Sequence, residues 1–305
     1  MTTGQTGRRF LCALLLNFLC QSGLRAETLT IATYNVENYD ATNRMTEQGF
    51  RKEYPKPEAQ KTALRRVLHG LNADVLVLQE MGTAPYLEEL RRDLKAEGLD
   101  YPHAMLLEGP DEVRHVAILS RRPFTSVVQH TMLQFPYLGG REKVKRGLLE
   151  VRTATAQGEL TIFALHLKSR FTDRPDDPQS ALRRLGEAVA IRDAVLQEFP
   201  DPARARFVIA GDFNDDKASK PLQRILERGK TVIAALVPAT DARGETWTHN
   251  YRRQDNYTRV DHILVSPGLV NSVRGSAAKI YDGAGVAEAS DHRPVVVTLE
   301  FGGAK

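Results

Sequence analysis

The sequence predicts an α/β protein, a four-layer α-β-β-α sandwich in which two mixed β-sheets pack face to face between outer helices. Apolar runs that are typical of strands alternate with amphipathic stretches along most of the chain. Between residues 113 and 166, however, the strand candidates follow one another without an intervening helix. A doubly wound parallel sheet, the second choice, needs a helical crossover between successive parallel strands. The observed order therefore favours two sheets.

The strand candidates are short apolar runs bounded by turn residues. They lie at residues 29–33, 74–78, 116–120, 125–130, 147–154, 160–166, 207–210, 260–265 and 294–301. Four stretches have helical periodicity or composition: residues 58–71, 86–95, 181–198 and 221–227. We expect a polar loop with Pro55 and Pro57 before the first helix, and a surface loop rich in Asp and Pro at 171–180.

Residues 1–26 have the organisation of a signal peptide. Arg8 and Arg9 precede an apolar run at residues 10–20, and small residues near Ala26 offer a cleavage site. The run is too short to span a bilayer comfortably, which argues against a permanent anchor. We expect an exported protein, periplasmic or extracellular, whose residues 27–305 form one catalytic domain.

Removing this segment changes two bulk properties of the chain. Both cysteines, Cys12 and Cys20, lie within it, so the mature domain has no cysteine. The whole chain carries a net charge of +4, but without Arg8, Arg9 and Arg25 it has 39 basic residues against 38 acidic ones, a net charge of +1. Net charge therefore does not indicate a nucleic-acid partner, and only local patches can do so.

Polar residues collect at the ends of the predicted strands. In the stretch RFVIAGDFN, a buried run releases Asp212 and Asn214 two residues apart, after a glycine that allows close backbone approach. The full set is Asn35, Glu37, Glu80, His166, Asp212, Asn214, Asp261, Asp291 and His292. Carboxylate and amide oxygens suit Mg²⁺ or Mn²⁺, and histidines beside carboxylates suit proton transfer. The sequence thus predicts a metal and acid–base site.

Seven motifs in a fixed order carry a resemblance: TYNVEN, VLVLQE, HVAILSRRP, FALHLKSR, VIAGDFND, RVDHILVS and SDHRPV. Together they resemble the endonuclease/exonuclease/phosphatase superfamily, with its deoxyribonuclease I-like fold, from about residue 29 to residue 299. This superfamily includes secreted deoxyribonucleases, abasic-site endonucleases, inositol-polyphosphate phosphatases and sphingomyelinases. The HLKSR motif is most similar to that of bacterial extracellular nucleases.

The resemblance implies a role for each matching residue. Glu80 would be the principal metal ligand, with Asn35 and Glu37 beside it and Asp291 close by or linked through water. Glu37 stands where relatives often have Asp. Asp212 and Asn214 would position the attacking water and the phosphate, Asp261 would orient His292, and His166 would contact the scissile phosphate. Arg146 stands where relatives often have a phosphate-facing arginine, and it would bind substrate. Lys168, a basic residue shortly after His166, is a second substrate-binding candidate. Either His292 or Asp212 could be the general base.

The predicted function is a secreted divalent-metal-dependent phosphodiesterase, in first place an endonuclease acting on DNA or RNA. Three basic clusters support a nucleic-acid substrate: Arg141, Lys143, Lys145 and Arg146; Lys168 and Arg170; and Arg252, Arg253 and Arg259. The alternatives are a phosphatase or phosphodiesterase for a small-molecule or lipid phosphate, and an exported binding module without activity. We expect a monomer that does not insert into membranes.

Four residues outside this set have predicted roles of their own. His262 follows Asp261 on one strand and should point to the opposite face, in a structural role. His115 and His249 are further site candidates. Trp247 is expected to pack in the core or a loop.

Overall fold

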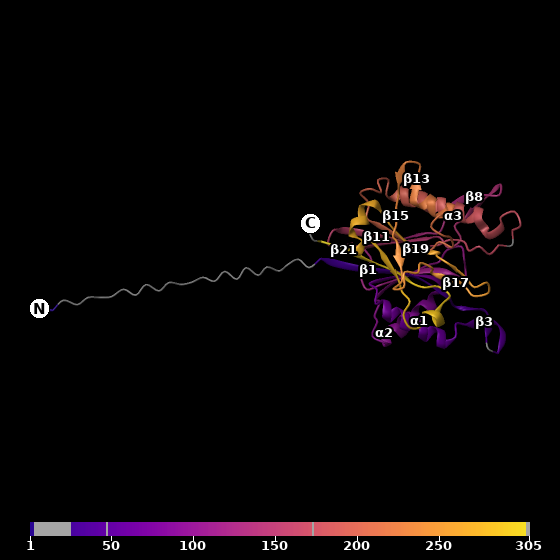
Figure 1. Cartoon of the computed structure of the whole chain (residues 1–305), viewed down its shortest axis with the longest axis horizontal. Coiled ribbons are helices and arrows are strands. Elements are labelled where there is room, and N and C mark those ends of the chain that lie inside the picture. Colours follow the sequence, from indigo (N-terminus) through magenta and orange to yellow (C-terminus); the bar gives the residue numbers. More distant parts are fainter. Residues whose placement is uncertain (3–25, 47, 173, 303–305) are drawn as a thin grey trace.

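The computed structural model describes residues 1–2, 26–46, 48–172 and 174–302. Residues 3–25, which make up most of the predicted signal peptide, lie outside this range. The domain is a four-layer sandwich, with α1 and α2 on one outer side and α3 on the other (Figure 1). The predicted fold class is confirmed, and the doubly wound sheet is wrong.

The first sheet has seven strands. Its middle strand, β1, carries Asn35 and Glu37 near its carboxyl-terminal end. Its order is β16-β20-β21-β1-β4-β6-β5, with β1 parallel to β4 and antiparallel to β21. The strands are β1 (Glu27–Tyr39), β4 (Val75–Met81), β5 (His103–Leu107), β6 (His115–Ser120), β16 (Ala239–Thr240), β20 (Ala278–Ile280) and β21 (Val295–Phe301). β1 and β4 run further than predicted, so Asn35, Glu37 and Glu80 lie within strands.

The second sheet has six strands, in the order β15-β19-β12-β11-β10-β7. They are β7 (Ser126–His130), β10 (Leu148–Thr155), β11 (Gly158–His166), β12 (Phe207–Asp212), β15 (Ala235–Leu236) and β19 (Asp261–Val265). β11 and β12 are parallel, and α3 connects them. The helix-free segment 113–166 supplies β6 to the first sheet and β7, β10 and β11 to the second.

The helices cover the outer faces of both sheets. They are α1 (Glu58–Leu71), α2 (Ala84–Ala96), α3 (Ala181–Glu198), α4 (Lys220–Leu226) and α5 (Val286–Ala289), with short 3-10 turns η1 (Pro178–Ser180), η2 (Pro267–Ser272) and η3 (Arg274–Ser276). Among the residues that the structure describes, no helix has the length and apolar character needed to cross a membrane.

Four two-stranded hairpins extend the loops. They are β2 (Ala41–Thr46) with β3 (Gly49–Pro55), β8 (Gln134–Tyr137) with β9 (Gly140–Lys143), β13 (Glu227–Arg228) with β14 (Thr231–Val232), and β17 (His249–Tyr251) with β18 (Asn256–Thr258). The prediction of a plain polar loop before α1 was wrong, because residues 41–55 form the first of these hairpins. Its strands are largely exposed, so they lack the apolar alternation by which a strand is recognised in sequence.

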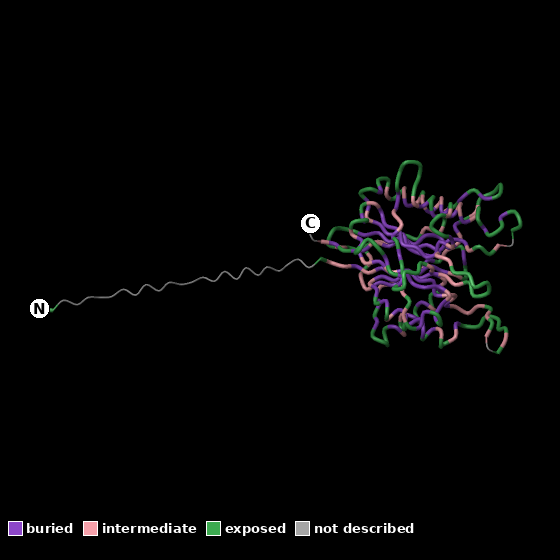
Figure 2. The backbone as a smooth tube through the Cα atoms, viewed as in Figure 1, coloured by how far each residue is buried: buried purple, intermediate pink, exposed green. Residues whose placement is uncertain are grey.

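Three apolar clusters hold the layers together. One lies between the two sheets and includes Ile31, Val77 and Ile162. The second packs α1 and α2 on the first sheet, and the third packs α3 and α4 on the second. The buried segments accordingly run through the middle of the molecule, and the exposed ones form its outer loops (Figure 2). Alternating side chains of one strand serve two clusters, so both faces of each sheet are buried.

Candidate active site

Three neighbouring strands of the second sheet bring His166, Asp212 and Asp261 into one row. His166 pairs in register with Asp212 across the parallel β11–β12 ladder, and Asp212 pairs with Asp261 across the antiparallel β12–β19 ladder. Paired residues on adjacent strands present their side chains on the same face. The row is buried, with exposed fractions of 1%, 1% and 0%. The three residues are therefore fixed to one another by backbone hydrogen bonding.

Asp212 is the point where the two sheets meet in the site. The amide of Asn35, on β1, donates to Asp212 Oδ2 over 3.0 Å. His166 Nε2 lies 3.6 Å and His292 Nε2 lies 3.9 Å from the same oxygen. Burial, followed by the charge of Asp261, raises the pKa of Asp212 to about 7. This carboxylate can thus take up a proton near neutral pH.

His292 is held by Asp261 as the motif resemblance implied. Its Nδ1 lies 2.8 Å from Asp261 Oδ2, and the backbone N–H of His292 donates to the Ser290 hydroxyl over 3.0 Å. Burial lowers the pKa of His292, but the charges of Asp261, Asp212 and Asp291 outweigh it and hold that pKa well above the usual value. The ring is thus oriented with Nε2 toward Asp212.

His166 has a different environment. Neither of its ring nitrogens has a hydrogen-bond partner among the described residues, although both are buried. Burial, followed by the positive charge of Arg146, lowers the pKa of His166 well below the usual value. A buried imidazole without partners is costly in a finished core. Here it leaves a neutral ring available to a bound group.

Asn214 reaches the site by a turn and not by a continued strand. β12 ends at Asp212, and Asn214 has a positive φ of 52°. Its backbone N–H donates to Asp212 Oδ1 over 2.8 Å, and its amide donates to the carbonyl of Leu167 over 2.9 Å. Asparagine tolerates this backbone conformation better than most residues. The turn places Asn214 beside Asp212 and ties both to β11.

The predicted metal ligands lie where β1 and β4 become irregular. The β1–β4 register shifts between Asn35 and Tyr39, and the β4–β6 register shifts between Gln79 and Met81. Glu37 and Glu80 both have positive φ, 49° and 59°. Such bulges redirect side chains and are common next to functional sites. Glu37 is left close enough to Asp291 and Glu80 for both charges to raise its pKa.

The donor set fits a divalent cation. Burial, then the charge of Asp291, raises the pKa of Glu37, and Glu80 adds to the rise; Lys56, 4.0 Å away, opposes it. Mutual repulsion among carboxylates that share a site is the condition a cation relieves. Within the described ranges, two clusters bring ligand atoms within 4.8 Å: His249, Asp291 and His292, and Asp212, Asp261 and His292. Glu37 and Glu80 belong to neither cluster. The predicted metal ligands therefore do not all lie within this distance of one another.

The two predicted substrate-binding residues are both buried. Arg146 forms an ion pair with Asp111 at 2.9 Å, and its Nη1 donates to the carbonyl of Leu167 over 3.4 Å. The ammonium of Lys168 donates to Ser169 and to the carbonyl of Phe171. Lys168 therefore fastens its own loop, whereas the charge of Arg146 acts on His166.

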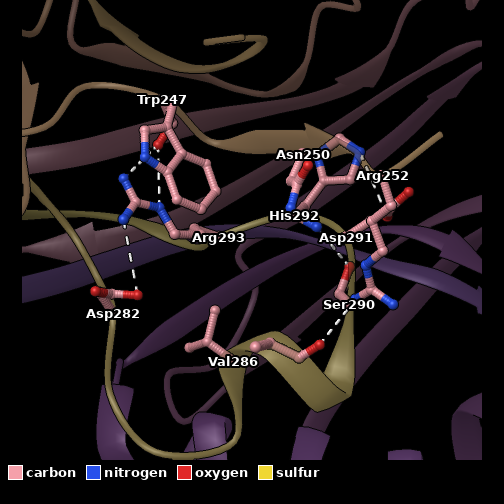
Figure 3. Close-up of a pocket in the computed structure, with 10 residues that line it drawn as sticks. Trp247, Asn250, Arg252, Asp282, Val286, Ser290, Asp291, His292 and Arg293 are labelled. Carbon is pink, nitrogen blue, oxygen red and sulfur yellow. Dashed lines mark hydrogen bonds and ion pairs between the residues drawn. The ribbon is translucent and has the colours of Figure 1, made fainter. Parts of the chain in front are cut away.

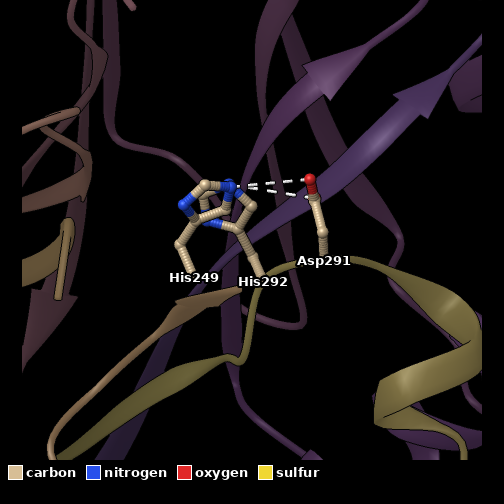
Figure 4. A group of neighbouring side chains, drawn as sticks. All are labelled: His249, Asp291 and His292. Carbon is tan, nitrogen blue, oxygen red and sulfur yellow. Dashed lines mark ion pairs between the residues drawn. The ribbon is translucent and has the colours of Figure 1, made fainter. Parts of the chain in front are cut away.

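His249, a further candidate from the sequence, lies against His292 and Asp291 in the folded chain. It forms an isolated β-bridge with His292, and the two rings are 4.6 Å apart. Its Nε2 lies 3.6 Å from Asp291 Oδ2, and this ion pair is drawn in Figure 4. After the opposing effect of burial, this contact and the charge of His292 lower the pKa of Asp291 to about 2. His249 thus holds Asp291 in its ionised form.

A cavity of about 240 Å³ opens beside these residues. Trp247, Arg252, Asp291 and His292 line it (Figure 3). Arg293 stacks on the indole of Trp247 at 3.5 Å, so Trp247 packs against a loop as predicted. His262 points away from the site, since its Nε2 lies 3.0 Å from the carbonyl of Asp215, which agrees with the structural role expected from strand alternation.

Two groups near the predicted metal ligands had no signal in the sequence. Lys56 is buried and donates to the carbonyl of Glu37 over 3.1 Å, and Arg114 lies 3.8 Å from Glu80. Lys56 stands between two prolines in a polar stretch, and its burial depends on the return of the β2–β3 hairpin to β1. His115, a predicted candidate, contacts the carbonyl of Leu107 through Nδ1.

The chain is similar to a known protein family over most of its length. The model of the Endonuclease/Exonuclease/phosphatase family matches residues 32–292. No curated protein sequence matches the chain.

Solved structures have the same fold at low sequence identity. The human Nocturnin catalytic domain is 15% identical, with a TM-score of 0.63 over 91% of this chain and 98% of that one. An endonuclease/exonuclease/phosphatase from Bacteroides vulgatus is 15% identical, with a TM-score of 0.62 over 90% and 100%. Sphingomyelinase C from Streptomyces griseocarneus is 16% identical, with a TM-score of 0.62 over 90% and 99%.

Proposed function

Because this chain belongs to the endonuclease/exonuclease/phosphatase family, which acts on phosphoester bonds, we propose that it is a divalent-metal-dependent phosphodiesterase that cleaves DNA or RNA internally. The observation that carries the proposal is the convergence of Asn35, His166 and the Asp261–His292 pair on Asp212 Oδ2. These residues form an acid–base group beside the carboxylates of the predicted metal site. Residues 27–305 contain no cysteine.

Mg²⁺ or Mn²⁺ at the donor set would neutralise charge on the phosphate and on the leaving oxygen. Asn35, Glu37, Glu80 and Asp291 are the residues that would hold it. Their oxygens match the hard ligands that Mg²⁺ prefers. Lys56 and His249 would keep Glu37 and Asp291 ionised and in place before the cation binds.

Asp212 is the group we assign as the proton acceptor for the attacking water. Its pKa of about 7 allows it to be ionised at neutral pH and still to accept a proton. His292, whose pKa is held well above the usual value, would remain protonated and donate from Nε2 to a phosphate oxygen. The rate of hydrolysis should then fall as pH decreases through about 7, and Asp212→Asn should remove most activity at every pH.

A nucleic-acid substrate is favoured by exposed cations on several loops. Arg252 lines the cavity beside Asp291 and His292. Arg170 follows His166 on the next loop, and Arg141 and Lys143 are on the β8–β9 hairpin. All four are exposed. Side chains of this kind neutralise backbone phosphates, and their binding is strongly salt-dependent.

A lipid phosphodiester is the second candidate substrate. Met45 and Phe50 face each other across the β2–β3 hairpin and are 78% and 55% exposed. This hairpin directly follows β1, which carries Asn35 and Glu37. Exposed apolar side chains next to a phosphate site would contact the acyl region of a lipid layer.

The deciding experiment is a substrate screen of purified residues 27–305. Plasmid DNA, RNA, bis(4-nitrophenyl) phosphate, phosphoinositides and sphingomyelin vesicles are tested with Mg²⁺, with Mn²⁺ and with EDTA. The proposal expects conversion of supercoiled plasmid to nicked and linear forms, inhibited by EDTA and by added salt. Turnover of lipid or small phosphates without cleavage of DNA or RNA would select the alternative substrate class.

Two variants separate the site from a contaminating activity. His292→Ala and Asp212→Ala should each remove cleavage while leaving the unfolding transition cooperative. Arg204→Ala, at an exposed position remote from the site, is the control and should keep full activity. Cleavage by both site variants at the wild-type rate would refute the assignment of the site.

Export is part of the proposal and rests on the pattern of residues 1–26. Expression of the full chain in a bacterial host should release a product whose amino-terminal residue is near Glu27. Replacement of Arg8 and Arg9 by glutamate should retain the uncleaved chain in the cytoplasm. A full-length chain in the periplasmic fraction would refute the predicted cleavage.

A further inference from the structure

Glu187 is a completely buried carboxylate that lies in none of the seven sequence motifs. It lies on α3, and its exposed fraction is 0%. Burial raises its pKa, while the N–H of Lys145 and the charge of Arg146 act in the opposite direction. A buried carboxylate is expensive unless it is fully hydrogen-bonded. A carboxylate in this position, on a helix that packs against a sheet, therefore calls for a structural explanation.

Both carboxylate oxygens of Glu187 accept backbone hydrogen bonds from two separate loops. The N–H of Lys145 donates to Oε1 over 3.0 Å, and the N–H of Lys168 donates to Oε2 over 2.7 Å. Lys145 immediately precedes Arg146, and Lys168 is two residues beyond His166. One side chain thus bridges the segments that carry Arg146 and His166.

Neighbouring contacts fix the same two segments from other directions. The carbonyl of Lys145 accepts from the N–H of Asp111 over 2.8 Å, and Asp111 forms the ion pair with Arg146. Arg184, one helical turn before Glu187, donates to the carbonyl of Lys168 over 3.1 Å. The peptide group of Lys168 is therefore held at its N–H by Glu187 and at its carbonyl by Arg184.

We propose that Glu187 is a positioning residue that sets the distance between the Arg146 guanidinium and the His166 imidazole, so that both meet one phosphate. The inference rests on the proposed phosphoesterase function. Arg146 Nη1 already lies 3.4 Å from the carbonyl of Leu167, the residue after His166. A displacement of about 1 Å between a charge and a reacting group costs a large factor in rate.

Glu187→Gln is the test variant. Glutamine has the same shape, but only one of its terminal atoms accepts, and its NH₂ group would face a backbone N–H. One of the two loops must then lose its partner. Hydrogen–deuterium exchange should show faster exchange, by at least tenfold, in peptides covering residues 143–147 or 167–170. Glu187→Asp, which keeps the charge but is shorter, is the second variant.

A double-mutant cycle separates positioning from a merely structural role. Glu187→Gln should lower kcat/KM for bis(4-nitrophenyl) phosphate at least tenfold in the wild-type background and much less in the Arg146→Ala background. Glu198→Gln, on the same helix but paired with Arg152, is the matched control and should change kcat/KM less than twofold.

The outcomes separate the two proposals. Equal losses of kcat/KM in the wild-type and Arg146→Ala backgrounds would overturn the positioning role, and so would unchanged hydrogen–deuterium exchange in both Glu187 variants. The phosphoesterase function would stand in either case. A wild-type chain inactive on every phosphate ester would overturn the function. Hydrogen–deuterium exchange would still show whether Glu187 holds the two loops. A chain without activity would, however, overturn the positioning role as well.

Discussion

His292 Nδ1 lies 2.8 Å from Asp261 Oδ2, and both side chains are buried. Asp261 begins β19 of the second sheet, and His292 lies in the loop that leads into β21 of the first sheet. The contact therefore connects the two sheets. The pair fixes which nitrogen of the imidazole faces Asp212. The chemistry of the site therefore depends on how the two sheets are stacked.

Asp261→Asn should lower kcat by a factor of about 10² to 10⁴, because the amide removes the charge that raises the pKa of His292 and its NH₂ group can face Nδ1, so that the ring is less often protonated and less firmly oriented. Steady-state kinetics at saturating Mg²⁺ measures the loss. Asp193→Asn, at an exposed position on α3, is the matched control and should keep its rate. A change of less than threefold for Asp261→Asn would contradict the orientation role.

Mg²⁺ should raise the unfolding temperature of the wild-type chain, because a ligand that binds only the folded state stabilises it, by about 2.7 kcal/mol at 100 times Kd. EDTA should reverse the rise and stop hydrolysis. In Glu80→Gln the rise should nearly disappear. Without metal, this variant should unfold at the wild-type temperature or above it, since one repelling charge is gone.

The control for the metal experiment is Glu288→Gln, on the exposed side of α5. It should respond to Mg²⁺ like the wild type. An undiminished Mg²⁺ response in Glu80→Gln, measured by thermal scanning over a range of concentrations, would place the cation elsewhere.

Gly211→Ala should destabilise the domain by about 3 kcal/mol or more, because a Cβ at this position would lie 2.0 Å from the carbonyl oxygen of Leu165 on β11. Urea unfolding measures the change. Gly140→Ala is the control, since its Cβ would lie 3.7 Å from the nearest backbone atom. Equal stability of the two variants would mean that β11 and β12 are less closely apposed.

Acid should destabilise the protein through His262. Burial, then the charge of Arg259, lowers the pKa of His262 from 6.5 to about 4. Between these values the unfolded chain binds a proton that the folded chain does not. The stabilisation is therefore complete above pH 6.5 and is lost as pH falls to about 4, in total about 3 kcal/mol.

His262→Gln keeps a donor for the Asp215 carbonyl but cannot titrate. The free energy of unfolding, measured by urea titration between pH 4 and pH 7, should therefore fall less steeply in this variant, by up to about 1.4 kcal/mol per pH unit. Identical slopes for variant and wild type would show that folding does not lower the pKa of His262.

The sequence predicted much of the site because the chemistry sits at the ends of apolar strands. Asp212, His166 and Asp261 follow or begin such runs, and in-register pairing then brings them together. Hairpin β2–β3 and the burial of Lys56 were missed, since exposed strands have no apolar alternation and a single lysine gives no sign of its partner. Glu187 was missed for the same reason, because its partners are backbone N–H groups of distant loops.

The sequence by itself determined the fold class, the positions of the main strands and the residue types available for phosphoester chemistry, because these follow from local periodicity and from motif order. Only the tertiary structure decided how the side chains meet. The contact of His249 with His292 and the bridge made by Glu187 join residues far apart in the chain. Such contacts arise when two sheets and their helices pack, and no local pattern records them.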